Sequence, residues 1–395
     1  MPPRNLAALI AGPLLLLTAC SAPVATDETE KPHGYVEGAA ESSEPQLTIA
    51  TVDAAGEVSL LDLLDESRES VADLDSVSAV DTDGRFVFAT TPEGVAIVDT
   101  GVWTVDHEDH SHYYRAEPGV VGTVRGVGPA AVTGGGAVTA VAFADGETVL
   151  LDTDALGTGE IVEVDRVTAD LVAPFGAATL VASGGTVSVR EQPDTRIACA
   201  SPSGSIATRA GLVIGCADGA VLATTASETV SLEAVPYPVP VAGPERATAF
   251  DGRPGRPTVA ALSGSAGFWL LDSRERVWHL LQTESPLLLV AAADDGGGTD
   301  KAGLVVALAD DGRILTLDGG TGATLAATEP LLAATVADPA LLAGVELTVD
   351  AGRAYLNAPA ENAVYEIDYA DGARVARTFA MPAAPLFLAE TGRVS

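Results

Sequence analysis

From residue 47 onward, short apolar runs alternate with turns that are rich in small residues. Representative pairs are TIATVDAAG with EVSLLDL, VTAVAFADG with TVLLDTD, and LVVALADDG with RILTLDG. Asp-Gly and Gly-Gly between alternating apolar runs are strong signals of β-hairpins. The sequence predicts eight such hairpins, with turns near Gly56, Gly94, Gly146, Gly185, Gly219, Ser265, Gly312 and Asn362.

The spacing of these hairpins predicts an all-β fold, a β-propeller. The turns recur irregularly, at about forty residues, which is the size of a four-stranded blade. A solenoid or a pair of β-sandwiches also contains many short strands, but a sandwich gives no reason for similar hairpins at blade spacing. We expect eight blades, or seven if residues 170–235 form only one. LFLAETG near the C-terminus lacks a following hairpin, so we expect it to pair with the first hairpin and complete a blade.

The first residues have the layout of an export signal. Arg4 precedes an apolar run from Leu6 to Leu17. That run is too short to span a bilayer. Leu17-Thr18-Ala19-Cys20 resembles a bacterial lipobox, in which the cysteine becomes the first mature residue and carries lipid. An ordinary signal peptide that ends near a cysteine is the alternative.

Three segments therefore follow from the sequence: a lipoprotein signal peptide (1–19), a flexible tether (20–46) and a single propeller domain (47–395). The tether is rich in Ser, Pro, Ala, Glu and Thr, which favours disorder. It contains His33-Gly34-Tyr35, followed by Glu37 and Glu41. We expect an extracytoplasmic protein that is anchored to the outer face of the cell membrane through lipid on Cys20, and that touches the membrane nowhere else.

Charge and cysteine content narrow the functions further. The chain has 21 Lys and Arg against 55 Asp and Glu, a net charge of −34. Nucleic acid is therefore excluded as a partner, because phosphate binding needs a basic face. Besides Cys20, only Cys199 and Cys216 are present. Export to an oxidising compartment predicts a disulfide between them, and a zinc site is less favoured because no CxxC pair exists.

The chain has five histidines, and three of them lie within the stretch VDHEDHSHYY, residues 105–114. In an extended strand His110 and His112 face one side, together with Asp106 and Glu108. His107 and Asp109 then face the other side, unless the chain turns at Glu108-Asp109. Because the stretch follows GVAIVDT, the third strand of its blade, we expect it to form the outermost strand or the loop to the next blade.

Imidazole and carboxylate groups together suit zinc, copper or nickel, and zinc is the best single choice because it needs no redox partner. Calcium would use oxygen ligands and would have little use for three histidines. A polar loop with incidental histidines is the alternative. The other two histidines have weaker cases on the residues alone: His33 lies in the tether, and His279 lies beside Trp278 in the strand-like RVWHLLQ.

WTVDHEDHSHYYRAEP, the tail HGYVEGAAE and the cysteine pair of this exported propeller resemble the AztD-type zinc metallochaperones. The resemblance covers nearly the whole mature chain. It implies a β-propeller outside the inner membrane that binds zinc and passes it to the zinc-specific solute-binding protein of an ABC importer. It implies zinc ligands at His107, His110 and His112, less firmly at Asp109 and Asp106, and also at His33; Cys199 and Cys216 match the family's disulfide pair.

Two features depart from that family. Many members carry a histidine shortly after the first cysteine, whereas CASPSGSIA here has none, so a second zinc site is weakened or built differently. The lipobox implies surface anchoring, whereas other members are soluble. The leading hypothesis is a monomeric zinc carrier that is not an enzyme. The alternatives are a metal-dependent hydrolase or lyase with Glu108 as base, although GxSxG and HExxH motifs are absent, and a metal-independent interaction scaffold.

Overall fold

The computed structural model describes residues 34–107, 110–227, 229–264, 267–294 and 303–393. The chain divides into two compact units, Met1–Tyr35 and Val36–Ser395, and all strands of the described residues belong to the second. Among the described residues, no helix has the length and apolarity needed to cross a membrane. The predicted lipidation site, Cys20, lies outside these residues.

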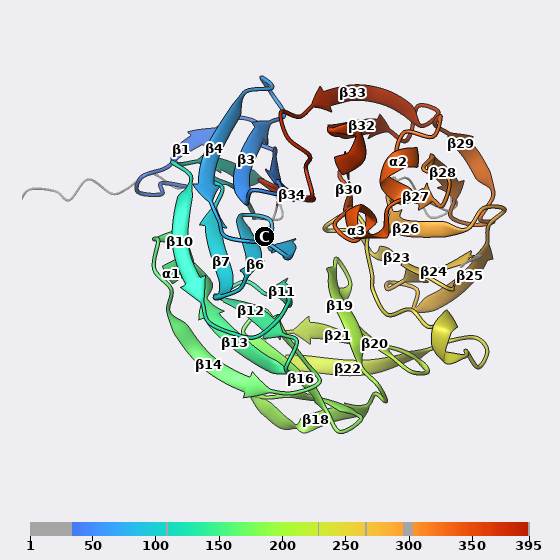
Figure 1. Ribbon diagram of the computed structural model, residues 1–395. Helices are drawn as coiled ribbons and strands as arrows, with labels where there is room; N and C mark the ends of the chain where they lie inside the picture. The colour runs from blue at the N-terminus through green and yellow to red at the C-terminus, as the bar shows by residue number, and fades with distance from the viewer. Residues whose placement is uncertain (1–33, 108–109, 228, 265–266, 295–302, 394–395) are drawn as a thin grey trace, which may run out of the picture. The chain divides into compact units, whose positions relative to one another are not determined.

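Eight antiparallel sheets repeat one plan, in which the strands run up and down from an inner to an outer position (Figure 1). The first four, in strand order, are β34 (Phe387–Thr391), β2 (Thr48–Val52), β3 (Glu57–Asp62) and β4 (Arg68–Asp73); β5 (Ala79–Thr82), β6 (Phe86–Thr91), β7 (Gly94–Asp99) and β10 (Gly119–Val124); β11 (Ala130–Gly134), β12 (Val138–Phe143), β13 (Glu147–Asp152) and β14 (Glu163–Thr168); and β15 (Leu171–Phe175), β16 (Ala178–Ser183), β17 (Thr186–Val189) and β18 (Gln192–Ala198).

The other four sheets follow in chain order, and one of them has three strands in the described part of the chain. They are β19 (Ser203–Thr208), β20 (Gly211–Cys216), β21 (Gly219–Ala226) and β22 (Thr229–Pro236); β23 (Thr258–Leu262), β24 (Gly267–Asp272) and β25 (Val277–Gln282); β26 (Leu287–Ala292), β27 (Leu304–Ala309), β28 (Ile314–Asp318) and β29 (Thr324–Ala327); and β30 (Leu347–Val349), β31 (Ala354–Ala358), β32 (Ala363–Asp368) and β33 (Arg374–Ala380).

The prediction of eight propeller blades is confirmed, and so is the pairing of the two ends of the chain. β34 pairs with β2 from Thr48 opposite Thr391 to Val52 opposite Phe387. Seven of the predicted turn residues lie in or beside the turns between paired strands, and the eighth, Ser265, lies outside the described residues. The local turn chemistry of Asp-Gly and Gly-Gly pairs therefore reports the strand pairing correctly.

Apolar side chains fill the space between neighbouring sheets. Phe86 and Phe88 of the second sheet pack with Val141 and Leu151 of the third, and the same kind of cluster recurs from each sheet to the next. The eighth and first sheets share one as well, which includes Tyr355, Val364, Ile49 and Leu61. The inner strands therefore have buried residues at consecutive positions, because both of their faces meet a neighbouring sheet.

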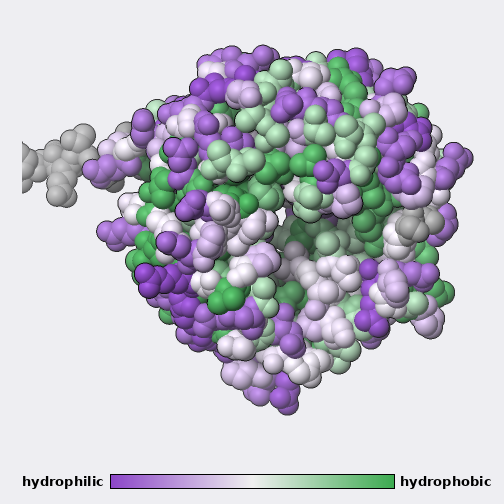
Figure 2. Space-filling model, viewed as in Figure 1, coloured by the Kyte–Doolittle hydropathy of each residue, from purple (hydrophilic) through white to green (hydrophobic). Residues whose placement is uncertain are grey.

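Short helical segments occupy some of the connections: α1 (Thr153–Gly157), α2 (Ala333–Val336), α3 (Pro339–Leu342) and the 3₁₀ turns Gly243–Glu245 and Pro359–Glu361. Figure 1 places β11, β19, β30 and β34 around the centre and β14, β18, β25, β29 and β33 at the periphery. Figure 2 shows that the same face is hollowed at its centre.

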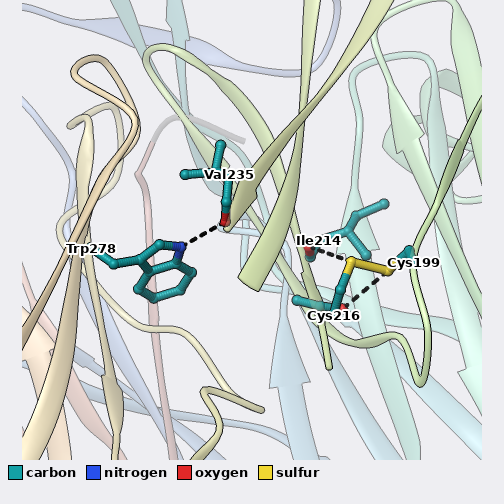
Figure 3. The surroundings of a disulfide bond; sticks show 6 residues. Cys199, Ile214, Cys216, Val235 and Trp278 are labelled. Atoms are coloured by element: carbon teal, nitrogen blue, oxygen red, sulfur yellow. Dashed lines mark hydrogen bonds between the residues drawn. A yellow bond between two sulfur atoms is a disulfide. The ribbon is translucent and has the colours of Figure 1, made fainter. Parts of the chain in front are cut away.

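The predicted disulfide is present and joins two neighbouring sheets (Figure 3). Cys199 directly follows β18, and Cys216 ends β20, with the two Cα atoms 5.1 Å apart. Both cysteines are buried against the apolar cluster between these sheets. Between the next two sheets, Trp278 Nε1 of β25 donates a hydrogen bond of 2.9 Å to the carbonyl of Val235 in β22. Neighbouring blades are therefore joined here by a disulfide and a hydrogen bond as well as by apolar packing.

Replacing both cysteines with serine is expected to lower the free energy of unfolding by about 3 kcal/mol, because the bond closes a short loop and limits the unfolded chain. The separation of 17 residues sets that estimate. Chemical denaturation of oxidised and reduced wild-type protein, beside the Cys199→Ser/Cys216→Ser variant, measures the effect. Equal midpoints for the oxidised protein and the variant would show that the bond contributes nothing to stability.

Candidate metal centre

The histidine-rich stretch forms a hairpin that interrupts the second sheet. β8 (Val102–Asp106) and β9 (Ser111–Arg115) leave the sheet after its third strand, and the chain then returns as the outermost strand, β10. The prediction that this stretch is itself the outermost strand, or the loop to the next blade, is therefore wrong. β8 and β9 instead form a separate small sheet, in which their side chains contact each other across the two strands.

A third strand completes that small sheet and comes from the predicted tether. β1 (Ala40–Ser42) pairs with β9, with Glu41 opposite Tyr114. The tether predicted to run to residue 46 thus contains an ordered strand at its end. This pairing joins residues more than seventy positions apart in the chain, so no local sequence signal marks it.

Specific contacts fix the hairpin to the propeller. Thr104 Oγ1 donates to the carbonyl of Gly392 at 2.7 Å, next to the end of β34. Trp103 and Tyr114 stack with ring centroids 5.0 Å apart, and the Arg85 guanidinium lies 3.8 Å from the Trp103 ring centre. At the base, Gly101 has a positive φ of +73°, and a Cβ there would lie 2.3 Å from the carbonyl oxygen of Ala116. The base of the hairpin is therefore joined to the propeller by several specific contacts.

The three histidines converge at the tip of this hairpin. His107 donates its backbone N–H to the carbonyl of His110 at 2.9 Å, which holds the backbones of these two residues side by side. The ring of His107 lies 5.2 Å from each of the other two, and those of His110 and His112 lie 4.9 Å apart, between centroids. His110 Nε2 and His112 Nε2 are 3.1 Å apart. All three imidazoles are thus close together, while Glu108 and Asp109, where the sequence leaves a turn open, lie outside the described residues.

His112 is held far more firmly than its two neighbours. It is 7% exposed, whereas His107 and His110 are exposed. Its Nδ1 lies 2.6 Å from Oε1 of Glu41, which reaches it from β1. An ionised carboxylate only accepts hydrogen bonds, so Nδ1–H is the donor, and in the neutral ring Nε2 then has no proton. Burial raises the pKa of the neighbouring Tyr114, and the Glu41 charge raises it further.

This donor set fits zinc in chemistry and in the spacing of its nitrogens. Two nitrogens bound to one tetrahedral zinc at about 2.0–2.1 Å lie about 3.3–3.4 Å apart. The 3.1 Å between the Nε2 atoms of His110 and His112 is close to that value. Across the described residues, no group of three or more His, Cys, Asp or Glu side chains is already placed to hold a metal ion. The nitrogen spacing therefore supports two of the three imidazoles, those of His110 and His112, as ligands of one ion.

Two of the remaining candidate ligands, Asp106 and His279, lie elsewhere in the described part of the chain. Asp106 pairs with Ser111 and so faces away from His112, on the other side of the hairpin. His279 is exposed on β25, in a different sheet. Asp109 and His33 lie outside the described residues. Sequence reasoning missed Glu41 as a partner of His112, and the only signal for it was its position in the HGY segment.

A second group of titratable residues lies at the inner strands, away from the histidines. Asp81, Asp251, Glu346 and Glu390 line a cavity of about 90 Å³ beside Arg393. Burial raises the pKa of Asp81 to about 6 and that of Asp251 to about 7. Burial, with repulsion from Asp251 and Asp81, raises the pKa of Glu346 to about 8. Asp81, Asp251 and Glu346 therefore take up protons near neutral pH in the folded protein, and burial also raises the pKa of Glu390.

The raised pKa values predict that the protein loses stability as pH rises from about 5 to about 8. Over that range the folded state binds more protons than the unfolded state, so the free energy of unfolding falls with pH. Glu346→Gln removes part of this dependence and is expected to be more stable than wild type at pH 8.5 but not at pH 5. Thermal unfolding across pH measures it, with the exposed Glu93→Gln as control. An unchanged pH profile in Glu346→Gln would contradict it.

Comparisons with known proteins agree on the architecture. No protein-family profile matches the chain, and no curated protein matches it either. Two solved structures of AztD from Citrobacter koseri are similar to it. The apo form has a TM-score of 0.71 at 15% identity, and the other a TM-score of 0.65 at 16%; each comparison covers 88% of this chain and 97% of AztD. The fold is AztD-like. The dihydro-heme d1 dehydrogenase NirN is also similar, with a TM-score of 0.51 at 17% identity over 86% of this chain and 74% of NirN.

Proposed function

We propose that this protein is an extracytoplasmic zinc carrier, which binds zinc at the tip of the β8–β9 hairpin and delivers it to the solute-binding protein of a zinc importer. Export and lipid anchoring through Cys20 belong to the same proposal. The AztD-like fold supports it, together with the sequence resemblance to AztD-type metallochaperones.

The convergence of His107, His110 and His112 carries this proposal. Three of the chain's five histidines lie in this one hairpin, and Glu41 of β1 is a carboxylate partner for the most buried of them, His112. A hydrogen bond from the distal ring nitrogen to a carboxylate is typical of zinc-binding histidines, because it orients the ring and raises its basicity. His112 and Glu41 have this arrangement.

The difference in exposure between the histidines suggests how zinc leaves. His112 is buried and held by Glu41, whereas His107 and His110 are exposed. A ligand from an incoming protein reaches zinc from the exposed side and replaces the outer imidazoles first. His112 then releases the ion last, so zinc stays coordinated throughout the transfer.

The alternative of a metal-dependent enzyme has less support. A catalytic zinc site keeps one position open for water and is enclosed, so that a base and substrate are placed against it. Here two of the three imidazoles are exposed at a hairpin tip. An exposed site favours exchange of the ion over chemistry at the ion.

A transfer experiment tests delivery directly. Zinc-loaded protein is mixed with the apo form of its cognate solute-binding protein in the presence of a strong chelator, and zinc occupancy of the acceptor is followed over time. We expect the acceptor to fill faster than the chelator alone removes zinc from the carrier. Transfer no faster than chelator-driven release would show that zinc passes through solution and would contradict delivery by contact.

A further inference from the structure

A cavity of about 610 Å³ lies behind the histidine hairpin, on the face opposite His112. Thr104, Asp106, Ser111 and Tyr113 of the hairpin form one wall. Four arginines from three other parts of the chain also line it: Arg209, Arg253, Arg256 and Arg393. Its volume is in the range of small-molecule sites, about 300–1,000 Å³.

The charge of this cavity is opposite to that of the whole protein. The chain carries a net charge of −34. The cavity has four guanidinium groups against two carboxylates, those of Asp106 and Asp350. A concave surface with an excess of one charge concentrates ions of the other sign. The lining of the cavity therefore favours anions, in contrast to the acidic composition of the whole chain.

Backbone hydrogen bonds hold three of the arginines next to one another. The N–H of Arg209 donates to the carbonyl of Arg256 at 3.3 Å, and that of Arg256 donates to the carbonyl of Arg253, also at 3.3 Å. Arg209 follows the end of β19 in one sheet, while Arg253 and Arg256 precede β23 in the next. The arginines are thus brought together by the meeting of two sheets.

Two of these guanidinium groups already have polar partners at the inner strands. Arg253 Nη1 makes a long hydrogen bond of 3.4 Å to the backbone oxygen of Asp294. Arg393 Nη1 donates to Thr348 Oγ1 at 2.9 Å and lies 3.4 Å from Oε2 of Glu390. The spare donors therefore come chiefly from Arg209 and Arg256. Arg209 and Arg256 form no ion pair with a carboxylate anywhere in the described ranges. Elsewhere arginines do pair, as Arg85 does with Asp99 at 2.6 Å. Five donors on each planar group match the paired oxygens of carboxylates and phosphates.

We propose that this cavity is a binding site for a small polyvalent oxyanion, one that carries two or more carboxylate or phosphate groups. The guanidinium groups bind its charged ends, and Thr104, Ser111 and Tyr113 of the hairpin also line the cavity. The site is separate from the proposed zinc site, because the two occupy opposite faces of one hairpin.

Calorimetric titration of the zinc-free protein tests this proposal without relying on zinc. Citrate, pyrophosphate and a short peptide of aspartates serve as probes and distinguish a small carboxylate, a phosphate compound and an acidic segment of a protein. We expect saturable binding of at least one probe that weakens as ionic strength rises. Absence of saturable binding of all three at millimolar concentration would overturn the proposal.

Arginine variants locate the site. Arg209→Gln/Arg256→Gln is expected to weaken binding of the probe at least about tenfold, because it removes charge-assisted hydrogen bonds to the anion. Arg68→Gln/Arg274→Gln removes the same charge from two exposed arginines that do not line this cavity, and is the matched control. Equal weakening in both double variants would show a general charge effect and would contradict the site. If the first variant does not fold, Arg256→Lys keeps the charge but loses the planar fork, and unchanged affinity there would count against the proposal.

Discussion

Replacing His107, His110 and His112 together with alanine is expected to lower zinc affinity at least about a hundredfold, because loss of even an outer partner of a zinc ligand costs about 10–100-fold. All three rings lie within 5.2 Å of one another, so the substitution removes the whole cluster. Competition titration against a chromophoric zinc chelator measures the affinity. The fold should be unaffected, because two of the rings are exposed and the hairpin is fixed at its base.

His279→Ala is the matched control for that variant. His279 is exposed on an outer strand of another sheet, and its loss should leave zinc affinity at the wild-type value. Retention of wild-type affinity by the triple variant would contradict a zinc site at the hairpin and would favour a metal-independent scaffold.

Glu41→Gln is expected to weaken zinc binding by about 10–100-fold, although Glu41 is placed as a partner of His112 and not as a ligand. The amide keeps the shape of the side chain but loses the negative charge of Oε1, which lies 2.6 Å from Nδ1 of His112. The same competition titration measures the loss. Glu44→Gln, an exposed change two residues beyond β1, controls for the change in net charge.

The outcome also separates two roles for β1. If Glu41→Gln binds zinc as tightly as wild type while the triple histidine variant does not, the carboxylate does not tune the site, and β1 only covers the hairpin. Equal losses in Glu41→Gln and Glu44→Gln would assign the effect to net charge and not to the hydrogen bond.

The sequence predicts the blades well because their signals are local. Asp-Gly at 145–146 and Gly-Gly at 184–185 each lie between apolar runs that pair as β12 with β13 and β16 with β17. Such turns fix the register of the strands that they join. The pairing of β34 with β2 is not local, yet it follows from counting, because each end of the chain lacks the strand that the other supplies.

The histidine hairpin was harder to predict because its strands break the repeat. Trp103, Tyr114 and Arg85 form a contact across two sheets, and the sequence carries no marker of that contact. Histidine content alone identifies the candidate ligands His107, His110 and His112. It does not identify Glu41, which approaches from a strand about seventy residues earlier, nor does it show that Asp106 faces the opposite side.

The arginine cavity illustrates the same limit. Arg209, Arg256 and Arg393 are widely spaced in a chain with an excess of acidic residues, and no motif connects them. They meet only because two neighbouring sheets and the C-terminal strand end at the same place.

Anomalous diffraction at the zinc absorption edge, from crystals of the zinc-loaded protein, tests the central claim most directly. We predict an anomalous peak at the tip of the β8–β9 hairpin, within bonding distance of Nε2 of both His110 and His112, and with Glu41 still bonded to His112. A single peak at the buried carboxylates Asp251 and Glu346, with none at the hairpin tip, would contradict the account.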